Sequence, residues 1–158
     1  SLPGTVHGVR YPREALDALR AAGLDYRGWI ANADVPLAFA RHKLTVHIPR
    51  RPYVEALPGI PTIRVFEALA SGIPLISAPW DDCEGLFRVG QDFLMVEDGA
   101  AMEAAMRLII NDREAAEHLA ANGRATVLLR HTCRHRALEL LEIVGSLTQP
   151  ASLEKGVA

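Results

Sequence analysis

The residues best suited to chemistry lie at the start of one predicted helix, over residues 61–71. A loop that contains Pro58 and Gly59 leads into this helix, and the free N–H groups and positive dipole end of a helix start attract anions. Arg64 lies in the first turn and adds a guanidinium suited to phosphate. Glu67 follows three residues later, so it lies on the same face. A nucleoside diphosphate needs this set of groups: donors for its phosphates and a carboxylate that accepts from its ribose hydroxyls.

The spacing of Arg64 and Glu67 fits a second interpretation equally well. The two side chains could form an ion pair on the helix surface, worth roughly 0.3–0.5 kcal/mol. The spacing alone leaves both interpretations open.

Further candidates follow the end of a predicted strand, Thr45-Val46-His47-Ile48. His47 could contact phosphate or sugar, or it could be a hydrogen-bonded structural histidine. Arg50 and Arg51 could hold phosphate, or they could be a solvated pair in a loop.

The next strand is followed by Trp80, by the pair Asp81 and Asp82, and by Glu84. Trp80 could line a ligand pocket or pack beneath the loop. Two carboxylates could act as an acid/base pair only if both lay near one scissile bond. An acidic turn that caps a helix explains them without chemistry.

His131, Cys133 and His135 have spacings that resemble part of a zinc site. A closed zinc site needs four ligands, and no fourth ligand is near in sequence. We therefore expect no metal site, and we expect both histidines to anchor the start of the last helix by hydrogen bonds.

The elements that must position these residues alternate between short apolar runs and helical patterns, which is typical of βα units and a parallel sheet. Strands are predicted over residues 5–9, 26–30, 44–48, 74–78 and 92–96. Helices are predicted over residues 12–22, 34–42, 61–71, 84–88 (a short turn), 100 onward and 133–147, with a loop over 49–61. Asp34 and Asp112 are predicted helix caps, and Asn122-Gly123 is a predicted interruption.

The fold expected from this pattern is α/β: a Rossmann-like parallel sheet of about five strands flanked by helices, with a helical C-terminal third. Ligands of such sheets bind beyond the carboxyl ends of the strands. His7-Gly8, Trp29-Ile30, residues 47–50 and residues 77–79 occupy those ends.

Composition sets broader limits. The chain has 158 residues, of which 49% are hydrophobic and 23% charged, and this suits one globular domain. Its formal net charge of −2 gives no general case for nucleic acid or an anionic membrane. No apolar run approaches the ~18 residues that span a bilayer. The two cysteines, Cys83 and Cys133, predict reduced thiols in a cytoplasmic protein.

Residues 66–76, FEALASGIPLI, resemble the E-A-(L/M)-A-(S/C)-G-x-P signature in the C-terminal domain of GT-B fold glycosyltransferases. The similarity is to the retaining family that includes sucrose synthases and many bacterial lipopolysaccharide enzymes. The form TIRVFE, residues 62–67, further resembles a branch of spore-protein-like glycosyl transferases. Residues 84–87, 90–94 and 131–136 resemble motifs farther along the same domain.

The resemblance implies roles for particular residues. Glu67 would accept hydrogen bonds from the ribose of the donor nucleotide, and Thr62 and Ile63 would offer backbone N–H groups to its diphosphate. Trp29 and Ile30 would border the base. The domain would span residues 1–147, residues 148–158 would be a flexible tail, and an acceptor-binding Rossmann-like domain would lie upstream.

The chain also departs from the resembling family. Gly59 stands where a second glutamate is common, eight residues before Glu67. A basic pair that often holds the donor phosphates would lie before residue 5, in a stretch that this sequence does not contain. Arg50 or Arg51 could substitute for it.

The function implied is transfer of a sugar from a nucleoside-diphosphate sugar, which is the donor substrate, to an unknown acceptor, with no separate cofactor. The alternative is a non-catalytic nucleotide-sugar-binding module that keeps the fold without transferase activity.

Overall fold

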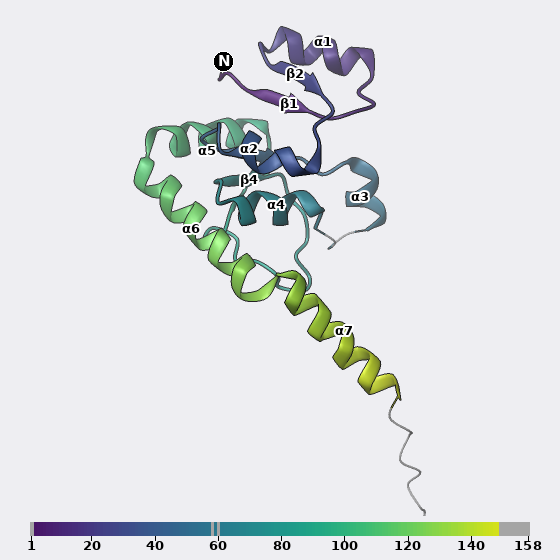
Figure 1. The fold of residues 1–158 in the computed structure, drawn as a ribbon. Coiled ribbons are helices and arrows are strands. Elements are labelled where there is room, and N and C mark those ends of the chain that lie inside the picture. The colour runs from purple at the N-terminus through teal and green to yellow at the C-terminus, as the bar shows by residue number, and fades with distance from the viewer. Residues whose placement is uncertain (1, 58, 60, 149–158) are drawn as a thin grey trace, which may run out of the picture. The chain divides into compact units, whose positions relative to one another are not determined.

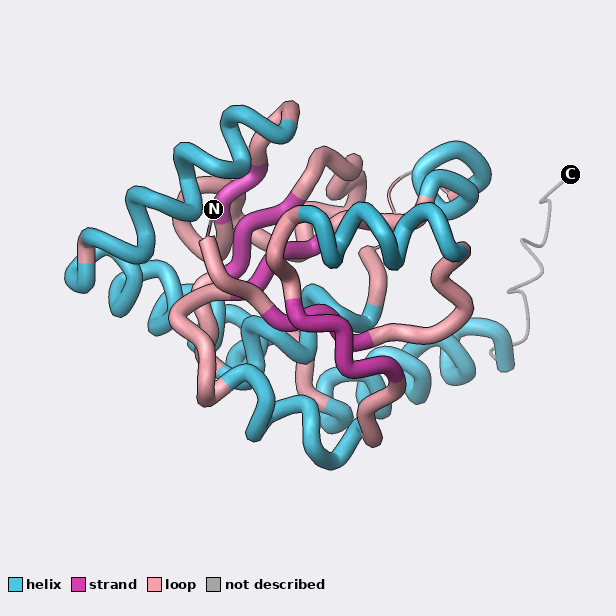
Figure 2. The backbone as a smooth tube through the Cα atoms, turned by 90° about the horizontal axis from the view of Figure 1, so that it is seen from above, coloured by secondary structure: helices cyan, strands magenta, loops and turns pink. Residues whose placement is uncertain are grey.

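The computed structural model describes residues 2–57, 59 and 61–148, and the chain divides into two units, Ser1–Arg41 and His42–Ala158. The tail predicted over residues 148–158 lies outside the described residues from residue 149 onward. Figure 2 shows that short strands and longer helices alternate along the backbone.

The first unit is one βαβ turn followed by short helices (Figure 1). Strands β1 (Thr5–His7) and β2 (Asp25–Gly28) pair in parallel, and α1 (Arg13–Ala21) connects them. The short elements η1 (Asn32–Asp34) and α2 (Val35–Phe39) follow. Asp34 occupies the N-cap position of α2, but its side chain makes no capping hydrogen bond.

The second unit contains a three-stranded parallel sheet in the order β3 (Thr45–His47), β4 (Leu75–Ser77), β5 (Leu94–Met95). All three residues of the central strand β4 are buried. The five predicted strands are therefore present and parallel, in a sheet of two and a sheet of three.

Helices α4 (Ile63–Ser71), α5 (Gly99–Asn111) and α6 (Arg113–Arg130) cover this sheet. Ile76 of β4, Ile109 of α5 and Leu119 of α6 form a buried core cluster. Asp98 caps α5 and Asp112 caps α6, each accepting a hydrogen bond from a backbone N–H three residues later. The predicted cap at Asp112 is thus confirmed.

The last helix, α7 (Cys133–Thr148), extends away from the rest of the second unit (Figure 1). It buries none of its described side chains, and its leucines, Ile143 and Val144 are about half exposed or more. Across the described residues no helix is long and apolar enough to cross a membrane.

Three predictions about elements were wrong. Residues 51–56 form helix α3 (Arg51–Ala56) inside the predicted loop, because proline is tolerated in the first turn of a helix. Residues 84–88 form turns and a bend instead of a short helix.

Asn122-Gly123 does not interrupt α6, which is continuous. A side chain at Gly123 would place its Cβ 2.6 Å from both the Asp92 carbonyl oxygen and the Leu69 Cδ2. This glycine is therefore required for the close packing of α6 on α4.

Candidate functional site

Helix α4 presents the candidate residues at one end of the three-stranded sheet. Its buried face consists of Val65, Ala68 and Leu69, at the spacing expected for one side of a helix. Gly72 ends the helix in the left-handed conformation, φ 68°, which glycine adopts without a Cβ penalty. Thr62 precedes the helix in extended conformation as its N-cap residue.

His47 joins this helix start to the ends of two strands. Its Nδ1 lies 2.9 Å from Ser77 Oγ at the end of β4, and its Nε2 lies 2.9 Å from Thr62 Oγ1. The first turn of α4 therefore lies at the carboxyl end of β3, which is the edge where ligands of parallel sheets bind.

The His47 ring is buried, and this burial lowers the pKa of His47 from its ordinary value. Desolvation disfavours the charged imidazolium, so the ring is neutral near pH 7. Both ring nitrogens have hydrogen-bond partners in the protein. The geometry agrees with the structural interpretation of this histidine.

Arg64 and Glu67 form an ion pair on α4, with Arg64 Nη1 2.6 Å from Glu67 Oε2. The Glu67 side chain is 25% exposed and that of Arg64 is 45% exposed. The Oε2 atom itself is buried, and no described donor makes a hydrogen bond of good geometry to it. The contact is a charge pair, and the carboxylate can still accept hydrogen bonds from further donors.

Gly59 has no room for a side chain. Its backbone is left-handed, with φ 87°, and a Cβ there would lie 2.5 Å from the Cys83 sulfur and 3.2 Å from the Asp81 carbonyl oxygen. The Cys83 thiol lies 3.9 Å from the Gly59 carbonyl oxygen. Glycine therefore fits this position, and a glutamate would require both the loop and Cys83 to move.

Trp80 packs beneath the loop that follows β4. Its ring stacks on the fully buried Phe93, with centroids 6.0 Å apart and an interplanar angle of 15°. Its Nε1 is buried, and no described group accepts a hydrogen bond from it.

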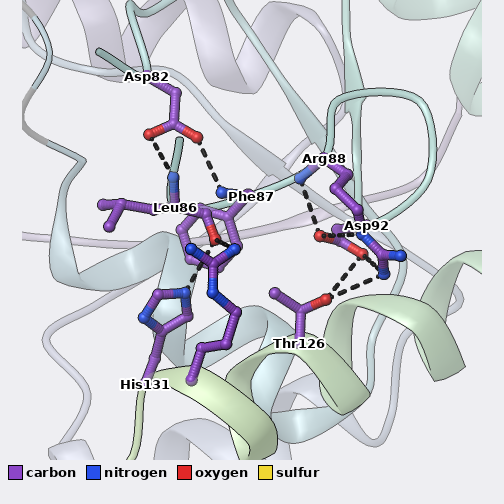
Figure 3. Close-up of polar contacts among 8 residues, drawn as sticks. Asp82, Leu86, Phe87, Arg88, Asp92, Thr126 and His131 are labelled. Carbon is purple, nitrogen blue, oxygen red and sulfur yellow. Dashed lines mark hydrogen bonds and ion pairs between the residues drawn. The ribbon is translucent and has the colours of Figure 1, made fainter. Parts of the chain in front are cut away.

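The three acidic residues after β4, Asp81, Asp82 and Glu84, differ in their contacts. Both carboxylate oxygens of Asp82 accept hydrogen bonds, from the backbone N–H groups of Leu86 and Phe87 (Figure 3). Asp82 therefore fixes the loop, which agrees with the acidic-turn interpretation, although the turn does not lead into a helix. Asp81 and Glu84 are exposed.

A buried carboxylate holds the far end of this loop. Asp92 is fully buried and accepts from the Arg88 backbone N–H, from the Arg88 guanidinium and from the Thr126 hydroxyl of α6 (Figure 3). The sequence prediction treated Asp92 as the start of a strand and missed this role. A carboxylate in an apolar run must find partners, and Arg88 four residues earlier was the available signal.

The predicted anchoring by histidines is present in two forms. His131 Nε2 donates to the Leu86 carbonyl oxygen at 2.9 Å, and its ring contacts those of Phe66 and Phe87. His135 Nδ1 accepts from the Thr132 hydroxyl at 2.7 Å, at the start of α7. Among the described residues no cluster of histidine, cysteine and acidic side chains could hold a metal ion.

Three further predicted residues follow the ends of β2 and β3. Trp29, which is 73% exposed, and the half-buried Ile30 follow β2 in the first unit. Arg50 follows β3 and is exposed. Ser77 was predicted only as part of a strand end, and its hydrogen bond to His47 was not predicted. Its signal was a hydroxyl inside the apolar run Leu75–Ala78.

Comparisons with known proteins agree with this fold. The model of a family described as glycosyl transferase-like matches residues 1–142. No curated protein matches the sequence.

Solved structures are similar to this chain as well, among them the three that follow. HepE from Anabaena in complex with UDP has 18% identity and a TM-score of 0.74 over 90% of this chain and 40% of that chain. Sucrose-phosphate synthase from Thermosynechococcus elongatus has 19% identity and a TM-score of 0.70 over 85% of this chain and 34% of its own. The C-terminal domain of LpcC, a glycosyl transferase group 1 family protein from Francisella tularensis, has 17% identity and a TM-score of 0.57 over 83% and 86% of the two chains.

At these identities the likeness concerns the fold. This chain spans well under half of the length of the first two structures.

Proposed function

Because the chain belongs to the glycosyl transferase-like family, whose model matches residues 1–142, we propose that it is the donor-binding domain of a glycosyltransferase. It binds a nucleoside-diphosphate sugar and supports transfer of the sugar to an acceptor. The observation that carries the proposal is the first turn of α4, which lies at the carboxyl end of β3 and joins Thr62, Arg64 and Glu67.

In this proposal the N–H groups of Thr62, Ile63 and Arg64 bind the diphosphate, since a helix start has N–H groups without intrahelical acceptors. Arg64 adds a fixed positive charge at 45% exposure. Negative charge builds up on the departing diphosphate in the transition state, so these preorganised groups lower the barrier.

Glu67 accepts from the ribose hydroxyls. Its Oε2 lies 2.6 Å from Arg64 Nη1, and a carboxylate has about four lone-pair sites, so Glu67 keeps acceptor capacity for hydroxyl donors. The family resemblance assigns Trp29 and Ile30 to the base, and it assigns Arg50 and Glu84, which are exposed, to the donor. The protein works in the cytoplasm, and transfer proceeds with retention of the anomeric configuration.

The acceptor and any general base belong to a second Rossmann-like domain upstream. HepE, of which this chain matches 40%, was solved with UDP and with UDP-glucose, and this supports the choice of a uridine nucleotide as the first probe. The active site is then a cleft between two domains, which closes around the donor.

The test is calorimetric titration of UDP into the full chain and its variants. Arg64→Ala should weaken binding about tenfold or more, because a hydrogen bond to a charged group is worth roughly 1.5–3 kcal/mol. Glu67→Gln should weaken binding less, and the two losses should be partly non-additive because both residues hold one ligand.

The controls are Arg107→Ala and Glu103→Gln, which break an ion pair on α5 whose side chains are 53% and 60% exposed. They should leave the affinity unchanged. If Arg64→Ala and Glu67→Gln each change it by less than about threefold, under roughly 0.7 kcal/mol, Arg64 and Glu67 form only a surface ion pair and the proposal fails.

The alternative, a binding module without transferase activity, is favoured by Gly59. The Cys83 sulfur fills the space that a side chain at this position would need, so no carboxylate can reach the donor from there. Release of UDP from UDP-glucose over many turnovers by the full-length protein, with or without added acceptor, would exclude this alternative. Tight UDP binding by the full-length protein with no turnover on any nucleotide sugar would favour it.

A further inference from the structure

His47 takes part in a directed chain of hydrogen bonds. The Ser77 hydroxyl donates to the Ala78 carbonyl oxygen at 2.7 Å, so Ser77 Oγ is left as the acceptor in its 2.9 Å contact with His47 Nδ1. The proton of the neutral ring therefore resides on Nδ1. The other nitrogen, Nε2, must accept, and the Thr62 hydroxyl donates to it at 2.9 Å.

This direction has a consequence for α4. Thr62 is its N-cap residue, and a threonine at that position ordinarily accepts a hydrogen bond from the N–H of the second or third helical residue. Here the Thr62 side chain makes no capping hydrogen bond. The N-cap residues of α5 and α6, Asp98 and Asp112, do cap their helices, at 2.8 and 2.9 Å.

The contrast has a local cause. The Thr62 hydroxyl is held by a buried ring that is itself fixed at both nitrogens, on the side of Thr62 that faces the strand ends. The Val65 N–H already donates to the Thr62 carbonyl oxygen at 3.1 Å, which leaves the Arg64 N–H as the group to be capped. Rotation of the hydroxyl toward that N–H would leave His47 Nε2 buried without a donor. An unsatisfied buried acceptor is costly, so this rotamer change is opposed.

We propose that His47 is a positioning residue that withholds the Thr62 hydroxyl from the first-turn N–H groups of α4 and so keeps them open for the diphosphate of the donor. The proposal rests on the donor-binding function above and adds to it the residue that prepares the site. His47 acts through Thr62 and does not itself touch the ligand.

The test uses three variants of the full chain with UDP as the probe. His47→Leu frees the Thr62 hydroxyl to cap α4, and UDP must then displace that cap, so affinity should fall about fivefold, the factor that corresponds to an ordinary N-cap. Thr62→Val cannot cap but keeps the backbone N–H assigned to the diphosphate, so it should lose less affinity than His47→Leu does. The double variant should bind UDP within about twofold of Thr62→Val.

This recovery in the double variant is the decisive result, because loss of a merely structural histidine would not be repaired by removing a second hydrogen-bonding group. His47→Gln keeps an acceptor for Thr62 and should bind UDP almost as the original protein does. The proposal is overturned if the double variant binds UDP no better than His47→Leu does. It is also overturned if Thr62→Val alone weakens UDP binding as much as His47→Leu does.

Two controls locate the effect. Uridine lacks the phosphates, so its affinity should not respond to His47→Leu. His135→Leu removes the other His–Thr contact of this unit, at the start of α7, and should leave UDP binding unchanged. A fall in uridine affinity equal to that of UDP would place the effect of His47 elsewhere and overturn the proposal.

A measurement without ligand separates this inference from the proposed function. Amide hydrogen exchange at Arg64 should slow in His47→Leu, where Thr62 caps the helix, and should recover in the double variant. If UDP fails to bind the original protein, the donor-binding function is wrong, and the exchange rates still decide whether His47 withholds the hydroxyl. Unchanged exchange in His47→Leu would overturn the inference even if UDP binds.

Discussion

Single residues of this protein matter most where a polar group is buried, and His47 is the clearest case. Burial lowers the pKa of His47 below its ordinary value of 6.5, so the unfolded chain takes up a proton at a higher pH than the folded protein does. The stability that comes from the neutral ring is therefore complete above about pH 6.5 and is lost as the pH falls from there toward the lowered pKa.

We therefore predict that the free energy of unfolding decreases on acidification below pH 6.5, with a contribution from His47 of at most about 1.4 kcal/mol per pH unit. His47→Gln should remove that contribution, as measured by urea unfolding between pH 5 and 8. His118→Gln, at an exposed position on α6, should retain it. An identical pH profile for His47→Gln and the original protein would contradict this prediction.

Gly59 leads to a second prediction at this scale. Gly59→Ala should destabilise the protein by roughly 1–2 kcal/mol from the left-handed backbone, and further because its Cβ would lie 2.5 Å from the Cys83 sulfur. Cys83→Ala removes the overlap but not the backbone strain. Gly59→Ala should thus cost less in the Cys83→Ala background, as measured in a double-mutant cycle of unfolding free energies. Strictly additive costs would show that the two residues do not meet.

Among the helices and strands, the contact between α4 and α6 depends on one glycine. A Cβ at Gly123 would lie 2.6 Å from backbone and from Leu69, so Gly123→Ala should destabilise the protein by roughly 1–3 kcal/mol, as overpacking does. Gly145→Ala is the matched control on α7, where a Cβ would meet nothing within 4 Å. It should stabilise by roughly 0.5–1 kcal/mol through helix propensity. Equal thermal shifts for the two variants would refute the packing role of Gly123.

Elements with strong local signals were predictable from the sequence. Helix α4 has a proline before it, a stripe of apolar residues and a terminal glycine, and its predicted ends differ from the observed ones by two residues at most. Helix α3 was missed because prolines suggest a loop unless their place in the first turn is known. Asn122-Gly123 gave a false stop because tertiary packing on α4 decides the role of that glycine.

The candidate site was predictable only in part, because some of its contacts join residues that are distant in the sequence. Arg64 and Glu67 could be found from their spacing on one helix. The partnership of His47 with Thr62 and Ser77 joins residues 15 and 30 positions apart, and only the parallel register of β3 and β4 brings them together. Local sequence carries no signal for such a contact.

For the molecule as a whole, the share of the active site that this chain provides decides what it can do alone. The chain matches 40% of HepE and 34% of the sucrose-phosphate synthase. We predict that residues 1–158 alone bind UDP weakly and transfer no sugar, because half of the proposed cleft is absent. Continuous assay of UDP release from UDP-glucose, with the full-length protein as the positive control, measures this. Sustained turnover by residues 1–158 would refute the two-domain arrangement.

The contact between Gly59 and Cys83 also bears on how this sequence can change over time. A carboxylate at position 59 is opposed twice, because the thiol occupies its space and the backbone there, φ 87°, disfavours any side chain. Shortening Cys83 alone would clear the space around a glycine that cannot use it. Changing both residues would still leave the backbone strain, so a side chain at position 59 requires the loop itself to adopt another conformation.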